Sequence, residues 1–164
     1  MPTRRRFAAA LALSALPLQA FAQSSTTWKS LPFQWAITQK HGDGRSKVAV
    51  FSDPRCPYCR RFEADLARIG NVTVHVFPLA VLGPDSVRLA KGVWCAPDRA
   101  KAWEDVLHRR IAPPLAECEN PVDALRDYAQ RNGVRVTPTW FLENGERYVG
   151  AMPIDGLNLV LGRA

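Results

Sequence analysis

Residues 47–69, KVAVFSDPRCPYCRRFEADLARI, contain the signals that decide the fold. The run KVAVFS is compact, apolar and rich in β-branched residues, which is typical of a buried central strand. From Cys59 onward, apolar side chains recur at three- and four-residue steps and predict an amphipathic helix that extends to Ile69. The sequence therefore places a Cys-x-x-Cys motif, Cys56 to Cys59, between a buried strand and a helix.

This position predicts redox chemistry at the two cysteines. Cys56 lies where the helix begins, and unpaired N–H groups and the helix dipole favour an anion there, so we expect an activated thiolate. Pro57 suits the first helical position, because its missing N–H would be unpaired there anyway. Cys59 returns to the same helix face and can resolve a mixed disulfide on Cys56. Positive charge that favours the thiolate further comes from Arg55, Arg60 and Arg61.

Three other uses of a Cys-x-x-Cys motif must be weighed. A structural zinc site usually has four ligands, but the chain has one such pair, and its three histidines are scattered along the sequence. Haem attachment requires a histidine directly after Cys59, where Arg60 stands. We therefore expect neither a metal nor an organic cofactor. An inert structural disulfide between Cys56 and Cys59 remains open.

The rest of the chain predicts an α/β sheet covered by helices. The alternation of Phe33, Trp35 and Ile37 predicts a short strand, and residues 41–44 have the composition of a turn. Asn120 is a candidate helix cap, with Pro121 at the first helical position. The other expected elements are strands over 72–76, 139–142 and 147–149, with Asn144-Gly145 as a hairpin turn between the last two, and helical segments over about 85–110, from 121 toward 132–133, and over 155–161.

The first 22 residues have the layout of a secretory signal peptide. Arg4 to Arg6 form a positive start, an apolar stretch runs from Phe7 to Leu18, and Ala20-Phe21-Ala22 is a typical cleavage sequence. The stretch is shorter than the ~20 apolar residues of a membrane span. We therefore expect cleavage after about Ala22 and a mature chain that is exported and not inserted in the membrane. General secretory and twin-arginine export both remain open.

Composition predicts one globular domain that does not bind nucleic acid. The 164 residues are 47% hydrophobic and 23% charged. The formal net charge is +7, and three of the arginines lie in the predicted signal peptide, so the mature chain carries about +4. Its basic residues are interleaved with acidic ones and do not cluster.

The mature chain contains four cysteines: Cys56, Cys59, Cys95 and Cys118. An even number in an exported protein suggests disulfides, because that compartment is oxidising. Four cysteines allow three pairings, and the sequence alone does not choose among them.

At several of these segments the chain resembles the catalytic domain of the periplasmic disulfide isomerases DsbC and DsbG. The segments are residues 48–62 with Phe51-Ser52-Asp53-Pro54 and Cys56-Pro57-Tyr58-Cys59, residues 92–98 (GVWCAPD), residues 136–139 (VTPT), Asn144-Gly145 and Val149-Gly150. The resemblance implies a thioredoxin fold over 47–164, with a helical insertion at about 85–119, after a leader and an N-terminal strand over 23–46.

The resemblance also assigns roles to individual residues. Cys56 and Cys59 would be catalytic, with Pro57 and Tyr58 as their neighbours in the active site. Thr137 and a cis Pro138 would position the substrate peptide. Cys95 and Cys118 would form a structural disulfide, which stabilises by ~3 kcal/mol in the chain-entropy model. The implied partners are exported proteins with cysteines and a membrane or periplasmic protein that recycles the cysteine pair.

Two departures from the family leave the precise activity open. Only about 24 residues separate Ala22 from Lys47, too few for the dimerisation domain of these isomerases, for which about 50 residues would be needed. We therefore expect a monomer or weak dimer that acts as oxidase, reductase or isomerase. In addition, Val50 stands where thioredoxin carries a buried acid, and Asp53 is the nearest carboxylate to the motif in sequence.

Two alternative functions follow from the same residues. The Pro-Tyr pair between the cysteines also matches glutaredoxins, so a thiol transferase that uses glutathione is the alternative enzyme, although the signal peptide and the second cysteine pair weigh against it. A thioredoxin-fold binding protein with a permanent Cys56–Cys59 bond is the non-enzymatic alternative.

Overall fold

The computed structural model describes residues 26–114 and 117–162. The predicted signal peptide, residues 1–22, lies outside them. Within the described part of the chain, no helix has the length and apolar character that a membrane crossing requires.

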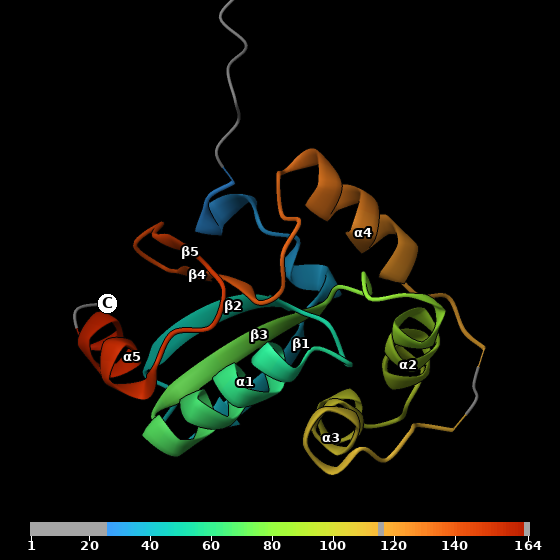
Figure 1. Ribbon diagram of the computed structural model, residues 1–164, viewed down its shortest axis with the longest axis horizontal. Coiled ribbons are helices and arrows are strands. Elements are labelled where there is room, and N and C mark those ends of the chain that lie inside the picture. Colours follow the sequence, from blue (N-terminus) through green and yellow to red (C-terminus); the bar gives the residue numbers. More distant parts are fainter. Residues whose placement is uncertain (1–25, 115–116, 163–164) are drawn as a thin grey trace, which may run out of the picture.

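The centre of the molecule is a mixed sheet of five strands (Figure 1). Its order is β1-β3-β2-β4-β5. β2 and β3 are parallel, and the other neighbours are antiparallel. The strands are β1 (Ile37–His41), β2 (Ser46–Ser52), β3 (Val72–Pro78), β4 (Thr139–Leu142) and β5 (Arg147–Val149).

Helices cover both faces of this sheet. Figure 1 shows α1 and α5 on one face, α4 on the other, and α2 and α3 beside the sheet. They are α1 (Pro57–Ile69), α2 (Pro84–Trp94), α3 (Arg99–Glu104) with a π-helical turn after it (Asp105–Arg109), α4 (Val122–Arg131) and α5 (Ile154–Leu161). A mixed sheet with this helical cover confirms the predicted thioredoxin fold.

β2 is the central strand and is buried on both faces. Val48 and Val50 pack in one core with Phe62 and Leu66 of α1. Ala49, Phe51 and Leu125 of α4 belong to the core on the opposite face. Successive residues of a strand point to opposite faces, so a strand between two helical layers must be apolar at nearly every position. This explains the continuous run KVAVFS, and it confirms the predicted strand.

The N-terminal strand differs from the prediction. Phe33 and Trp35 lie in a 3-10 helix, Phe33–Trp35, that follows another at Trp28–Ser30. The strand begins only at Ile37 and extends through His41, which was expected in a turn. The alternation was misleading because these aromatic side chains pack against other aromatic rings. Phe33 contacts Phe77 with ring centroids 5.9 Å apart, and Trp35 contacts Tyr128 at 6.5 Å.

The expected start of the helix at 121 was wrong by one residue. Pro121 is the N-cap, and the helix begins at Val122. Asn120 still serves the helix end, because its Oδ1 accepts a hydrogen bond from the Val122 N–H at 3.4 Å.

The segment between β3 and α4 is largely helical, and a disulfide and a close packing contact each join two parts of it. Cys95, at the end of α2, is bonded to Cys118, with 5.7 Å between their Cα atoms. Further back on α2, a Cβ at Gly92 would lie 2.6 Å from Cγ of Pro113. Glycine therefore allows the returning chain to pack directly on the helix.

Candidate active site

The local fold brings both cysteines of the motif to the N-terminus of α1. Cys56 is the N-cap, and its Sγ accepts a hydrogen bond from the Cys59 N–H at 3.4 Å. Pro57 occupies the first turn, as predicted. Both thiols are free, with Cys56 5% exposed and Cys59 fully buried. Cys56 is therefore the more accessible of the two sulfur atoms, and it lies at the end of the helix.

A loop from the far end of the chain faces Cys56. The Cys56 thiol donates to the carbonyl oxygen of Thr137 at 3.5 Å. The Thr137–Pro138 peptide bond is cis. The Gly150 N–H donates to the Pro138 carbonyl at 2.7 Å, and the Thr139 hydroxyl donates to the Val136 carbonyl at 2.6 Å. These bonds fix the backbone of the loop beside the reactive sulfur.

The Asp53 side chain, three residues before Cys56, is a buried hydrogen-bond acceptor. Its buried carboxylate accepts four hydrogen bonds of 2.8–2.9 Å, none of them from the cysteines. The donors are the N–H groups of Arg55, Val81 and Leu82 and the hydroxyl of Ser86. The Asp53 side chain thus joins the turn before Cys56 to the segment after β3, and only its backbone N–H bonds the Cys59 sulfur.

A buried glutamate lies behind Cys59, and the sequence reasoning missed it. Glu63 is 3% exposed and is held by donors from the Ser52 hydroxyl at 2.5 Å and the Trp103 indole N–H at 2.8 Å. Burial raises the pKa of Glu63 to about 7, although both hydrogen bonds lower it. A signal was present, because Glu63 lies four residues after Cys59 on the apolar face of the predicted helix. Val50, by contrast, is buried in the core and offers no ionisable group.

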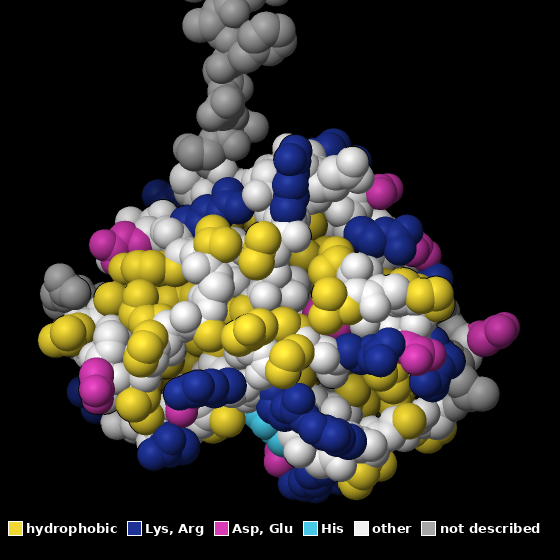
Figure 2. All heavy atoms as spheres, viewed as in Figure 1, with side chains coloured by type: hydrophobic (Ala, Val, Ile, Leu, Met, Phe, Trp, Pro, Cys, Tyr) yellow, Lys and Arg dark blue, Asp and Glu magenta, His cyan; other side chains and the backbone are white. Residues whose placement is uncertain are grey.

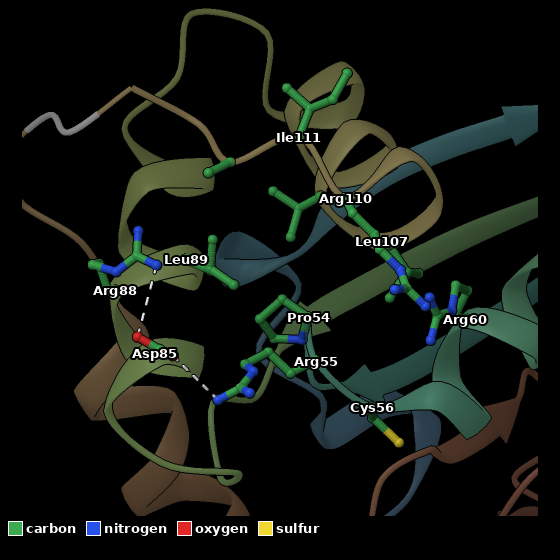
Figure 3. A pocket seen from close by; sticks show the side chains of 12 residues that line it. Pro54, Arg55, Cys56, Arg60, Asp85, Arg88, Leu89, Leu107, Arg110 and Ile111 are labelled. Atoms are coloured by element: carbon green, nitrogen blue, oxygen red, sulfur yellow. Dashed lines mark ion pairs between the residues drawn. The ribbon is translucent and has the colours of Figure 1, made fainter.

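A cavity of about 480 Å³ adjoins Cys56 on the side of the helical insertion (Figure 3). Arg55 and Arg88 both pair there with Asp85, at 3.4 and 3.7 Å. Four arginines and one aspartate line this cavity: Arg55, Arg60, Arg88, Arg110 and Asp85. Figure 3 shows the Cys56 sulfur pointing away from these arginines. They therefore make the surroundings of Cys56 positive without touching its sulfur.

Exposed apolar side chains surround the motif. Tyr58 is 67% exposed, and Val136 precedes the Thr137 loop. Val81 and Leu82, whose backbones bond Asp53, are also exposed. The face drawn in Figure 2 likewise mixes hydrophobic and basic side chains and shows fewer acidic ones. Such a surface suits an extended peptide with apolar residues.

The histidines do not gather around the cysteines. His75 contacts the Thr38 hydroxyl at 3.1 Å, on the neighbouring strands β3 and β1. His41 and His108 line a separate cavity together with Glu63 and Glu104. Among the described residues, no three or more His, Cys, Asp or Glu side chains are arranged to hold a metal ion.

A free cysteine pair at the N-terminus of α1, opposite a fixed loop of the same sheet, defines a thioredoxin-fold protein with a Cys-x-x-Cys site. Comparison with known proteins agrees, because residues 33–164 match the family model of the thioredoxin-like domain. The chain therefore belongs to the family of thioredoxin-like domains.

Its relatives are thiol:disulfide interchange proteins. The chain is 41% identical over 134 residues to the probable thiol:disulfide interchange protein DsbC of Bordetella pertussis, which covers 82% of this chain and 48% of that protein. It is 32% identical over 123 residues to DsbC of Escherichia coli K12, a match that covers 71% of this chain and 51% of that protein. The chain thus spans about half the length of the curated relatives it matches.

This chain also matches a solved structure, over nearly the whole length of that structure. The crystal structure of a disulfide interchange protein from Neisseria gonorrhoeae superposes with a TM-score of 0.77 and 37% identity, and the match covers 81% of this chain and 97% of that one. The resemblance to the catalytic domain of DsbC-like proteins is therefore confirmed.

Proposed function

We propose that the chain is a thiol:disulfide oxidoreductase or isomerase that exchanges disulfides with exported proteins through Cys56 and Cys59. One observation supports this most strongly. The slightly exposed Cys56 sulfur lies at a helix N-terminus and 3.5 Å from the Thr137 carbonyl, so an accessible thiol stands directly beside a backbone surface for a peptide.

The chemistry needs only the two thiols. The Cys56 thiolate attacks one sulfur of a substrate disulfide, and the other substrate sulfur leaves as a thiolate. Cys59 then attacks the Cys56 sulfur of this mixed disulfide, releases the second substrate sulfur and closes the Cys56–Cys59 bond. Two electrons pass from the cysteine pair to the substrate, and the reverse sequence oxidises a dithiol. No metal or organic cofactor is required.

Thr137 and Pro138 are proposed to position the substrate. A peptide lying extended along this loop would place its disulfide beside Cys56. The exposed side chains of Tyr58 and Val136 offer apolar contacts on either side of it. Substrates are therefore expected to be unfolded or flexible segments that contain cysteine.

The periplasm is the proposed compartment, and the predicted signal peptide and an oxidising environment for the Cys95–Cys118 bond support it. Each net oxidation or reduction leaves the Cys56–Cys59 pair in the wrong state for the next substrate. A membrane or periplasmic redox partner must therefore recycle it. The mature chain is proposed to act as a monomer or weak dimer.

Refolding of a protein with scrambled disulfides tests this function. The mature protein with a catalytic amount of dithiothreitol should restore the activity of scrambled ribonuclease faster than dithiothreitol alone. Restoration no faster than that background, together with a Cys56–Cys59 bond that resists mild reduction in the native protein, would support a binding protein instead. Faster exchange with a glutathione mixed disulfide than with protein disulfides would favour the thiol transferase.

A further inference from the structure

A buried path of hydrogen bonds leads away from the Cys59 sulfur. The Ser52 hydroxyl lowers the pKa of the Cys59 thiol through hydrogen bonding, and it donates to Oε1 of Glu63 at 2.5 Å. Ser52 and Cys59 are fully buried, and Glu63 nearly so. The path therefore joins a thiol to a carboxylate through one hydroxyl, away from bulk water.

We propose that Glu63 accepts, through the Ser52 hydroxyl, the proton that Cys59 loses when it resolves a mixed disulfide on Cys56. Glu63 does not touch the reacting sulfur atoms and acts on Cys59 only through Ser52. The inference rests on the proposed function, because it concerns the second step of that exchange.

The protons balance along this path. Before the step, the Cys59 S–H donates to Ser52 Oγ, and the Ser52 O–H donates to the Glu63 carboxylate. Both protons then shift by one hydrogen bond, which leaves a Cys59 thiolate, an intact Ser52 hydroxyl and a neutral Glu63. The thiolate attacks the Cys56 sulfur, the bond between Cys56 and the substrate sulfur breaks, and the substrate leaves as a thiolate with the electron pair.

The environment of each group suits its role. Burial raises the pKa of the Cys59 thiol, so this thiol needs an acceptor. Burial also raises the pKa of Glu63 to about 7, where a carboxylate can take up and release a proton near neutral pH. A hydrogen bond and the charge of Cys56 raise the pKa of Cys59 further, and both disappear once Cys56 is in a mixed disulfide. Cys59 is thus easiest to deprotonate at the step that requires it.

Trp103 and a cavity also adjoin Glu63, in addition to Ser52. The Trp103 indole N–H holds Oε2 at 2.8 Å, which leaves Oε1 directed at Ser52. Glu63 also lines a cavity of about 340 Å³ whose other walls are Gln39, His41, Ala67, Glu104 and His108. Through this cavity Glu63 can return its proton to solvent.

The titratable groups around Glu63 come from several elements. His41 from β1, Glu104 from α3 and His108 from the π-helical turn line the same cavity, and Cys59 lies one turn before Glu63 on α1. Burial lowers the pKa of both His41 and His108, and the Glu104 charge partly offsets this. Both histidines are therefore mainly neutral near pH 7 and add little positive charge to the cavity beside Glu63.

Ellman's reagent separates the two thiol steps in the reduced mature protein. Attack by Cys56 releases a first thionitrobenzoate and leaves a mixed disulfide, and attack by Cys59 releases a second. In Glu63→Gln the second phase should be at least about tenfold slower at pH 7, with its rise displaced to higher pH, while the first phase is unchanged. Ser52→Ala should have the same effect on the second phase.

Two further variants sharpen the test. Trp103→Phe removes a bond that lowers the pKa of Glu63, so the pH midpoint of the second phase should move upward. Asp65 has a largely buried carboxyl on the same helix, and this carboxyl pairs with Arg68. Asp65→Asn, the control variant, should leave both phases unchanged.

The outcomes distinguish this proposal from the one on which it rests. A second phase with the wild-type rate and pH profile in both folded Glu63→Gln and Ser52→Ala would overturn the proton path. Equal slowing of both phases in these variants would also overturn it, because a structural defect alone would explain that result. A wild-type protein without a fast first phase would contradict the proposed function itself.

Discussion

The Cys56 sulfur lies 3.5 Å from the carbonyl oxygen of Thr137, although 81 positions separate the two residues in sequence. β2 leads into the turn before Cys56, and β4 begins directly after Pro138. These strands pair side by side, with Phe51 opposite Thr139. The sheet therefore brings Cys56 and the Thr137 loop together, and it fixes their separation by strand register.

Replacing each active-site cysteine separates attack from resolution. Cys56→Ser should abolish exchange, because Cys59 is fully buried and cannot reach a substrate. Cys59→Ser should still attack but accumulate mixed disulfides, which mass spectrometry of acid-quenched reactions detects. Normal turnover by Cys56→Ser would contradict the assignment of the nucleophile.

Asp53 should matter for stability more than an exposed acid does. Asp53→Ala leaves three buried or partly buried N–H groups and the Ser86 hydroxyl without their acceptor, which should lower the free energy of unfolding by at least about 2 kcal/mol. Ser86→Ala is the matched control. It removes one donor, leaves the carboxylate three others, and should cost only about 1 kcal/mol in guanidinium unfolding. Equal losses in the two variants would contradict this role of the carboxylate.

The Cys95–Cys118 bond should stabilise the fold without taking part in exchange. It joins residues 23 positions apart, so replacing both cysteines by alanine should lower the free energy of unfolding by ~3 kcal/mol. The first Ellman phase, which reports Cys56, should keep its rate in the folded variant. A large loss of that rate at unchanged stability would show that this bond is part of the redox site.

Glu63 should make stability depend on pH. Its pKa is about 7 in the folded protein and near 4.5 when unfolded, so between these values the folded state binds more protons. The contribution of Glu63 to stability should therefore be greatest below pH 4.5 and fall by up to about 3 kcal/mol as the pH rises through this window to 7. Glu63→Gln should lack this slope and be the more stable protein at pH 8, as measured by guanidinium unfolding. Parallel pH curves for the two proteins would contradict the raised pKa.

The sequence predicted the elements whose signals are local. The apolar run before Cys56, the helix after it and the hairpin at Asn144-Gly145 depend on periodicity and turn chemistry, and all three are present. Gly145 has φ +93°, which shows why glycine is needed in that turn. The strand expected at Phe33 failed because its partly buried side chain packs on the ring of Phe77, far away in sequence, without pairing as a strand itself.

Only part of the site could be predicted from the sequence. The position of the Cys-x-x-Cys motif predicted a cysteine pair at the start of the helix, and the structure places it there. The approach of Thr137 to Cys56 and the pairing of Cys95 with Cys118 were expected only through the family resemblance. The place of Glu63 on the apolar face of the helix was a local signal, but its hydrogen bonds could not be predicted because its partners, Ser52 and Trp103, lie 11 and 40 residues away. No local pattern joins three such positions, and only the packed α1, β2 and α3 do so.

The reduction potential of the Cys56–Cys59 pair tests the central claim most directly. It can be measured on the mature protein by equilibration with glutathione redox buffers and trapping of free thiols. An exchanging pair predicts a value between about −120 mV and −270 mV, the range from DsbA to thioredoxin. A value below about −300 mV, typical of structural disulfides, would contradict the claim that this pair exchanges disulfides.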